Sequence, residues 1–222
     1  MLTGGYFIFF IPAMILSMIA SAMTKGTFRK YARVAASSGM TGGEAARRLL
    51  DSQGIDSVSV NHIGGFLTDH YHPLKKELNL SDGVYGSSSL AAIGVACHEA
   101  GHALQHAHGY GPLMFRSAMV PVTQFSSRIS YLVLILGLAM NFRPLVDIGI
   151  ILFSVAVLFS LVTLPVEWNA SSRAKRLMVS SGIVTAAEED DAGKVLNAAF
   201  LTYVAAAVSS IMTLLYYISR RR

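Results

Sequence analysis

Charged residues are scarce in this 222-residue sequence, at 14% for Asp, Glu, Lys and Arg together, whereas 53% of the residues are hydrophobic. A soluble domain carries about a quarter charged residues, so the composition excludes an ordinary soluble protein and predicts an integral membrane protein. Cysteine is almost absent, and the single Cys97 excludes an internal disulfide. The net charge of +5 comes from basic clusters beside apolar segments. Such clusters are typical of membrane flanks and give no reason to expect a nucleic-acid partner.

Four apolar segments are long enough to cross a bilayer. The first covers residues 4–23, and because basic residues follow it rather than precede it, it predicts an uncleaved anchor and not a signal peptide. Residues 117–140 and 145–164, joined by a short turn, predict a transmembrane hairpin. Arg128 lies near the middle of its first arm and is expected either to face protein or water, or to snorkel from a tilted helix. Residues 196–218 form the fourth segment.

Residues 24–112 carry the signals of a small non-spanning domain. Thr41-Gly42-Gly43-Glu44 is a capping box that predicts a short helix ending near Gly54. Residues 57–60 alternate as in a strand, and residues 66–72 and 77–80 predict a hairpin that turns at Pro73-Leu74-Lys75-Lys76. These strands either bind an extended peptide at a sheet edge or cover a neighbouring helix.

The pattern His98-Glu99-Ala100-Gly101-His102 lies in an apolar stretch that predicts a helix. Residues four apart share one helix face, so His98 and His102 can hold one metal ion while Glu99 accepts a proton from the attacking water. Two imidazoles suit zinc, and we expect one Zn²⁺ per chain. Cys97 is expected to be a small buried helix residue and not a nucleophile.

A catalytic zinc site needs a third protein ligand, and three residues are candidates. His106 lies two turns from His98 on a continuing helix and cannot close a compact site. His108 fits the last position of the pattern H-E-x-x-H-x-x-G-x-x-H, but Gln105 stands where that pattern has the glycine that breaks the helix. Glu167 is favoured, because the chain crosses the membrane twice between His102 and Glu167 and both residues therefore lie on the same side. Pro165 predicts the first turn of a new helix there.

The chain resembles the YugP-like family of bacterial membrane zinc metallopeptidases over nearly its whole length. The resemblance is carried by five stretches: Ala35-Ala36-Ser37-Ser38-Gly39-Met40-Thr41-Gly42, Gly65-Phe66-Leu67-Thr68-Asp69-His70-Tyr71, His98-Glu99-Ala100-Gly101-His102-Ala103-Leu104-Gln105, Leu164-Pro165-Val166-Glu167 with Asn169-Ala170-Ser171, and Leu201-Thr202-Tyr203-Val204-Ala205-Ala206-Ala207. It implies a bacterial plasma membrane location and a gluzincin-type site with His98, His102 and Glu167 on zinc and Glu99 as the base. The site is also similar to that of the HtpX and CaaX-processing membrane proteases, which place an Asp where this chain has Ser171. The hydrogen-bond partner of His102 is therefore left open, with Asn169 and Ser171 as the candidates.

The predicted fold class is a mainly α integral membrane protein with about four transmembrane helices and a small α+β zinc-metalloprotease domain. We expect an anchor at 1–23, the α+β domain at 24–116, a hairpin at 117–164, a ligand helix and connecting segment at 165–195, and a last span with an Arg tail at 196–222. The expected activity is hydrolysis of membrane-associated proteins or peptides, with the bilayer as the other partner. A zinc-binding scaffold or chaperone and a metal transporter are the alternatives. Glu99 disfavours the first, and the near absence of His and carboxylates from the spans disfavours the second.

The oxyanion of the reaction also needs a hydrogen-bond donor, for which His70, Arg128 and Tyr203 are candidates. The catalytic side is expected to face the cytoplasm, since basic residues near span ends favour that side. Nine such residues lie on the catalytic side, and four lie on the other. The nine are Lys25, Arg29, Lys30, Arg33, Arg116, Arg173, Lys175, Arg176 and Lys194; the four are Arg143, Arg220, Arg221 and Arg222.

Overall fold

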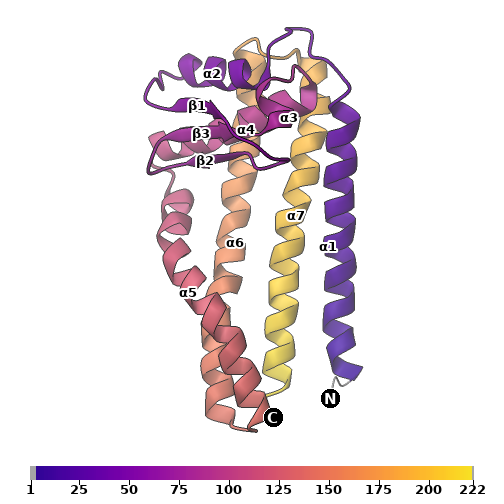
Figure 1. Cartoon of the computed structure of the whole chain (residues 1–222), viewed down its shortest axis with the longest axis vertical. Coiled ribbons are helices and arrows are strands. Elements are labelled where there is room, and N and C mark those ends of the chain that lie inside the picture. The colour runs from indigo at the N-terminus through magenta and orange to yellow at the C-terminus, as the bar shows by residue number, and fades with distance from the viewer. Residues whose placement is uncertain (1–3, 222) are drawn as a thin grey trace. The chain divides into compact units, whose positions relative to one another are not determined.

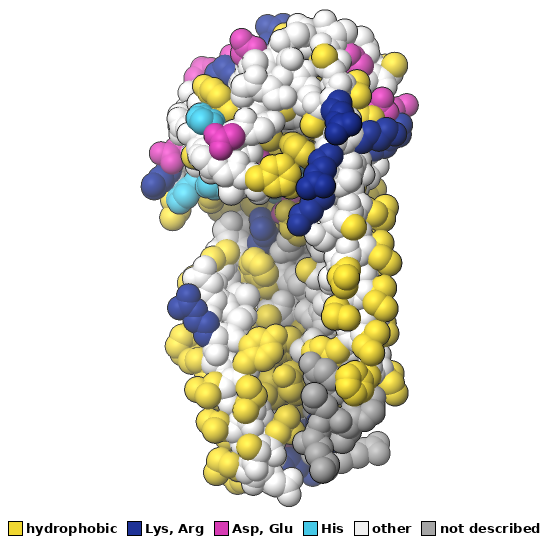
Figure 2. Space-filling view, turned by 45° about the vertical axis from the view of Figure 1, so that its right-hand side comes forward, with side chains coloured by type: hydrophobic (Ala, Val, Ile, Leu, Met, Phe, Trp, Pro, Cys, Tyr) yellow, Lys and Arg dark blue, Asp and Glu magenta, His cyan; other side chains and the backbone are white. Residues whose placement is uncertain are grey.

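The computed structural model describes residues 4–221 of the chain, so residues 1–3 of the predicted anchor and Arg222 of the predicted Arg tail lie outside the described residues. The described part is mainly helical with one small sheet (Figure 1), which confirms the predicted fold class. Its four long helices are α1 (Gly4–Tyr31), α5 (Gly111–Ala139), α6 (Arg143–Ser180) and α7 (Ala186–Ser219). All four are long and apolar enough to cross a membrane. Many large hydrophobic side chains are exposed on them (Figure 2), as expected for helices that face lipid.

The prediction that a new helix begins at Pro165 is wrong, because α6 runs without a break from Arg143 to Ser180 and contains this proline. A proline within a helix removes one backbone hydrogen bond and costs about 3 kcal/mol in water. Long helices of membrane proteins tolerate it where neighbouring groups satisfy the freed backbone. Glu167 therefore lies within the same helix as the apolar segment 145–164. The last helix also begins earlier than the expected span, at Ala186.

The chain divides into two compact units, and the predicted five-segment division stays a prediction. The apolar unit contains the chain up to Ser21, Gly111–Pro165 and Leu201–Arg222. Within it α5 and α6 pack closely, since a Cβ atom added to Gly149 would lie 2.6 Å from Leu134, which is fully buried. Asp147 of α6 pairs with Arg221 at 2.5 Å, so part of the basic tail is neutralised within this unit.

The second unit, Ala22–Tyr110 with Val166–Phe200, is called the mixed unit here because it combines helices with the sheet. Its strands are β1 (Ser59–His62), β2 (His70–His72) and β3 (Glu77–Leu80), in the order β1-β3-β2. β2 and β3 are antiparallel, which confirms the predicted hairpin, and β1 runs parallel to β3. Both outer strands are edges, and β2 lies against helix α4 (Leu90–Ala107).

Helix α2 (Gly42–Ser52) packs on α4 and begins at the predicted capping box. The Thr41 hydroxyl accepts from the Glu44 backbone N–H, and the Glu44 carboxylate accepts from the Thr41 backbone N–H. The buried face of α2 is made of small and aliphatic residues, so its backbone comes close to its neighbours: Gly42, Gly43, Ala45, Ala46, Leu49 and Leu50. Short helix α3 (Asp82–Tyr85) then leads into α4.

Helix α4 is the centre of the mixed unit, and two of its glycines permit close contact with other helices. A Cβ atom on Gly101 would lie 2.7 Å from the carbonyl oxygen of Ala170 in α6. A Cβ atom on Gly94 would lie 3.3 Å from the carbonyl oxygen of Ala192 in α7. Ala170 and Ala192 are themselves fully buried. The glycine in the His98–His102 pattern thus sets how closely α6 approaches the two histidines.

Candidate metal centre

Three side chains meet where α4 and α6 cross in the mixed unit. Their possible ligand atoms all lie within 4.8 Å of one another, and they belong to His98, His102 and Glu167. The Nε2 atoms of His98 and His102 lie 3.2 Å and 3.4 Å from the same Glu167 oxygen, Oε2. In the described part of the chain this is the one group of three or more such residues with metal-binding geometry.

These donors fit a zinc ion in number and type, and two of their three separations fit its geometry. Two imidazole nitrogens and one carboxylate oxygen are a usual protein ligand set for catalytic zinc. Ligand atoms about 2.0–2.1 Å from a tetrahedral ion lie about 3.3 Å apart, close to the two separations observed here. The Glu167 side chain is only 2% exposed, and a buried carboxylate needs a positive partner. A divalent cation would supply that charge.

Each histidine is held through its other ring nitrogen. His98 Nδ1 lies 3.0 Å from the Ser171 hydroxyl, and His102 Nδ1 lies 3.0 Å from Gln105 Oε1. Both contacts leave Nε2 directed at Glu167. Such outer contacts fix ring orientation in metal sites.

Asn169 and Ser171 are the two candidate partners of His102, and neither of them takes that place. Gln105, three residues along α4, takes that place. Asn169 instead accepts a hydrogen bond from the Gln105 amide at 3.0 Å, and Ser171 contacts His98. The signal was present in the sequence, since residues three apart on a helix can touch.

Glu99 is on α4 beside the two histidines and is 9% exposed. Burial acts to lower the pKa of the His102 imidazole, but the pKa is raised overall by the hydrogen bond and charge of Glu167, the charge of Glu99 and the hydrogen bond to Gln105. Cys97 is fully buried, and burial raises the pKa of its thiol to about 12, so it is no nucleophile at neutral pH.

The two other candidate third ligands, His106 and His108, and the candidate oxyanion donor His70 contact other groups. His106 Nδ1 lies 2.9 Å from the Tyr71 hydroxyl, and His108 Nδ1 accepts from Arg173 at 3.1 Å. The His70 ring contacts the carbonyl oxygen of Thr68 and the side chain of Asn79. None of these three histidines belongs to the cluster.

Arg128 and Tyr203, the other expected oxyanion donors, belong to the apolar unit. The Arg128 side chain is exposed on α5. An oxyanion role for either residue stays a prediction.

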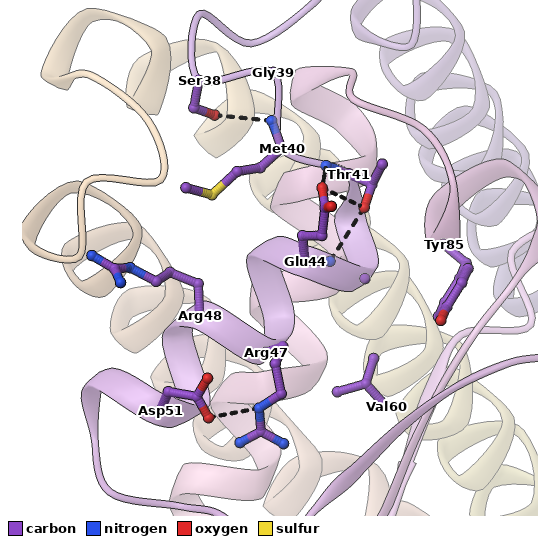
Figure 3. Close-up of a pocket in the computed structure, with 11 residues that line it drawn as sticks. Ser38, Gly39, Met40, Thr41, Glu44, Arg47, Arg48, Asp51, Val60 and Tyr85 are labelled. Atoms are coloured by element: carbon purple, nitrogen blue, oxygen red, sulfur yellow. Dashed lines mark hydrogen bonds and ion pairs between the residues drawn. The ribbon is translucent and has the colours of Figure 1, made fainter.

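One opening in the mixed unit does not include the cluster. It is a surface pocket of about 790 Å³ beside α2 (Figure 3), whose charged lining residues are Glu44, Arg47, Arg48 and Asp51. Arg47 is fully engaged there, with Asp51 and with the carbonyl oxygens of Ile55 and Val58. The pocket therefore has charges of both signs that pair with one another or with the backbone. The candidate metal ligands lie instead at the α4–α6 crossing.

Comparisons with known proteins point to the same chemistry. A family model described as "Putative neutral zinc metallopeptidase" matches residues 6–222. The "Putative membrane protease YugP" of Bacillus subtilis (strain 168) is 49% identical over 208 residues, which cover 94% of this chain and 92% of that protein. No solved structure matches the chain.

Proposed function

Since the chain belongs to the neutral zinc metallopeptidase family, we propose that it is a zinc-dependent endopeptidase that cleaves membrane-associated proteins or peptides. His98, His102 and Glu167 are the proposed zinc ligands, and Glu99 is the proposed general base. One observation carries the proposal: two histidines and a buried glutamate, 65 residues further along the chain, converge on one point beside a second buried glutamate.

Zinc bound there would make the attacking water more acidic and polarise the scissile carbonyl. The remaining steps belong to side chains of this chain. Glu99 accepts a proton from the water as the water attacks the carbonyl carbon, and then delivers that proton to the leaving amine. Glu99 is suited to this role because it follows His98 on α4 and is not one of the three clustered residues, so it would stay off the metal.

Two features support a peptide substrate at the membrane. The β2 strand is a sheet edge packed on α4, and an extended peptide can add to such an edge through backbone hydrogen bonds. Glu167 follows the apolar segment of α6 within the same helix. Membrane proteins and partly inserted segments are therefore the proposed substrates.

The test uses Glu99→Gln, which retains the side-chain shape but removes the base. Purified wild-type and variant proteins are loaded with equal zinc in detergent and incubated with a membrane-protein mixture. Wild type should cleave, and the variant should bind zinc equally but cleave about 10²–10⁴-fold more slowly. Equal cleavage by the two proteins would exclude Glu99 as the base. Zinc binding without cleavage by wild type would favour the zinc-binding scaffold.

We also propose that the mixed unit faces the cytoplasm, from the nine-to-four distribution of basic residues near span ends. Ser52 is exposed at the end of α2, so Ser52→Cys in a Cys97→Ser background provides one accessible thiol. An impermeant thiol reagent should label this variant only after the cells are opened. Strong labelling of intact cells would show the opposite orientation.

A further inference from the structure

A chain of hydrogen bonds connects the surface of α6 to the proposed metal centre. The Arg173 Nε–H group donates to Asn169 Oδ1 at 2.8 Å. The Gln105 amide nitrogen donates to the same oxygen at 3.0 Å and to the Val166 carbonyl oxygen at 2.8 Å. Gln105 Oε1 then lies 3.0 Å from His102 Nδ1. We call Arg173, Asn169 and Gln105 the orienting array.

Arg173 and the Val166 carbonyl oxygen together fix the direction of every hydrogen bond in the array. A guanidinium group can only donate, so the atom of Asn169 that faces it is the oxygen. That oxygen can accept but not donate, so the atom of Gln105 that faces it is the NH₂ group. The Val166 carbonyl oxygen demands the same orientation of Gln105. The oxygen of Gln105 is thereby left for His102.

An amide oxygen can only accept, so the proton of this last contact lies on His102 Nδ1. In the neutral ring that a metal ligand requires, the lone pair would then be on Nε2, the nitrogen that faces Glu167. We propose that Gln105 is a positioning residue that holds His102 in the Nδ1–H tautomer, and that Arg173 sets the direction of the array through Asn169. The inference rests on the proposed zinc site and adds a role that the three ligands and the base do not contain.

Burial of Gln105 makes its hydrogen bond to His102 specific. Gln105 is 0% exposed, so water cannot replace the hydrogen bond to His102. A buried amide also costs free energy unless its groups are paired, and here both ends of Gln105 have partners. The array therefore specifies one orientation of the His102 ring.

The test compares two substitutions at this position, Gln105→Met and Gln105→Glu. If Gln105 only fills space, the apolar Met should be tolerated and the Glu should be worse, since it places a carboxylate against Val166 O and Asn169 Oδ1. If Gln105 positions His102, the Glu should bind zinc more tightly than the Met, because it still accepts from His102 Nδ1. We expect Gln105→Met to weaken zinc binding about 10–100-fold, as loss of such partners does elsewhere, and Gln105→Glu to weaken it less.

Zinc affinity is measured by competition with a chelator, and unfolding of the metal-free proteins is followed in parallel. The visible absorption of the Co²⁺-loaded proteins reports on the coordination geometry. It should change in Gln105→Met. The matched control is Gln53→Met, the same chemical change at the C-terminal end of α2, where the amide donates to Ser52 within the described part of the chain. This control should bind zinc as wild type does.

Arg173→Met examines the same array from its half-buried end, with little risk to folding if Gln105→Met does not fold. It should weaken zinc binding less than the loss of Gln105, because Val166 O still orients the amide. Wild-type zinc affinity in Arg173→Met and in a folded Gln105→Met would overturn the inference and leave the proposed function intact. Absence of zinc binding by wild type itself would overturn both.

Discussion

Helix α4 and its C-terminal cap carry two pairs of histidines with different surroundings. His98 and His102 face Glu167, and their side chains are 13% and 10% exposed. His106 is half-buried against Tyr71 of β2, and His108 is exposed beside Arg173. The spacing of four residues continues from His98 through His102 to His106, so spacing alone does not separate the pairs.

The difference lies in what the neighbouring elements present. α6 crosses α4 closely enough at Gly101 to bring a carboxylate to the first pair. The second pair meets a phenol and a guanidinium, neither of which completes a zinc ligand set at neutral pH. A histidine on this helix is thus a candidate metal ligand because of Glu167.

The largest expected effect comes from removing that carboxylate. Glu167→Ala should lower the zinc content from about one per chain to nearly none and abolish cleavage. Only two imidazoles would remain, and a catalytic zinc site needs three protein ligands. The measurement is metal analysis of protein purified without chelators, with folding checked by thermal unfolding in detergent. His108→Ala is the matched control and should keep its zinc. Loss of zinc from His108→Ala alone would assign the third ligand to His108.

Much of this arrangement could be predicted from local patterns. The capping box at Thr41 and the hairpin of β2 and β3 depend on neighbours in the sequence, and both were predicted correctly. The meeting of Glu167 with the two histidines followed from counting membrane crossings, although zinc binding by the three stays a prediction. The parallel pairing of β1 with β3 was not predicted, because it joins segments that no short turn connects.

The predictions that missed concern residues of α4 and α6 whose contacts depend on long-range packing. Pro165 is compatible with a helix start, but α6 continues through this residue. Gln105 replaces the helix-breaking glycine of the H-E-x-x-H-x-x-G-x-x-H pattern, and that pattern does not reveal that Gln105 is the partner of His102. Asn169 and Ser171 are predicted to lie beside the zinc ligands. Which side chain each of them contacts depends on how α6 is rotated against α4. Sequence patterns do not give that rotation.

The close helix crossing gives the next largest effect. Gly101→Ala places a methyl group 2.7 Å from a backbone oxygen of α6, so the helices must separate. Such overpacking costs about 1–3 kcal/mol in the free energy of unfolding, and zinc binding should weaken as Glu167 moves from the histidines. Both quantities are measurable by denaturant unfolding in detergent and by chelator competition.

Two other glycines provide a graded control. Gly94→Ala meets its neighbour at 3.3 Å and should be milder, whereas Gly26→Ala has nothing within 4 Å. Gly26 lies within α1, so alanine there should stabilise the helix by about 0.5–1 kcal/mol. Equal effects at Gly101 and Gly26 would show that the crossing distance does not govern the site.

The smallest effect is expected at the second histidine pair. Tyr71→Phe removes the hydroxyl that lies 2.9 Å from His106 Nδ1 and leaves the aromatic ring, which packs against the imidazole with centroids 5.9 Å apart. Loss of one such hydrogen bond costs about 0.5–1.5 kcal/mol in the free energy of unfolding. The partly exposed setting favours the lower end of this range, since water can replace the hydroxyl. Zinc affinity should stay at the wild-type value, because neither residue belongs to the cluster of His98, His102 and Glu167. Chelator competition on the purified variant measures this directly. A loss of zinc affinity comparable to that of Gln105→Met would mean that the β2 contact holds α4 in register for the metal centre, and the two histidine pairs would then act as one unit.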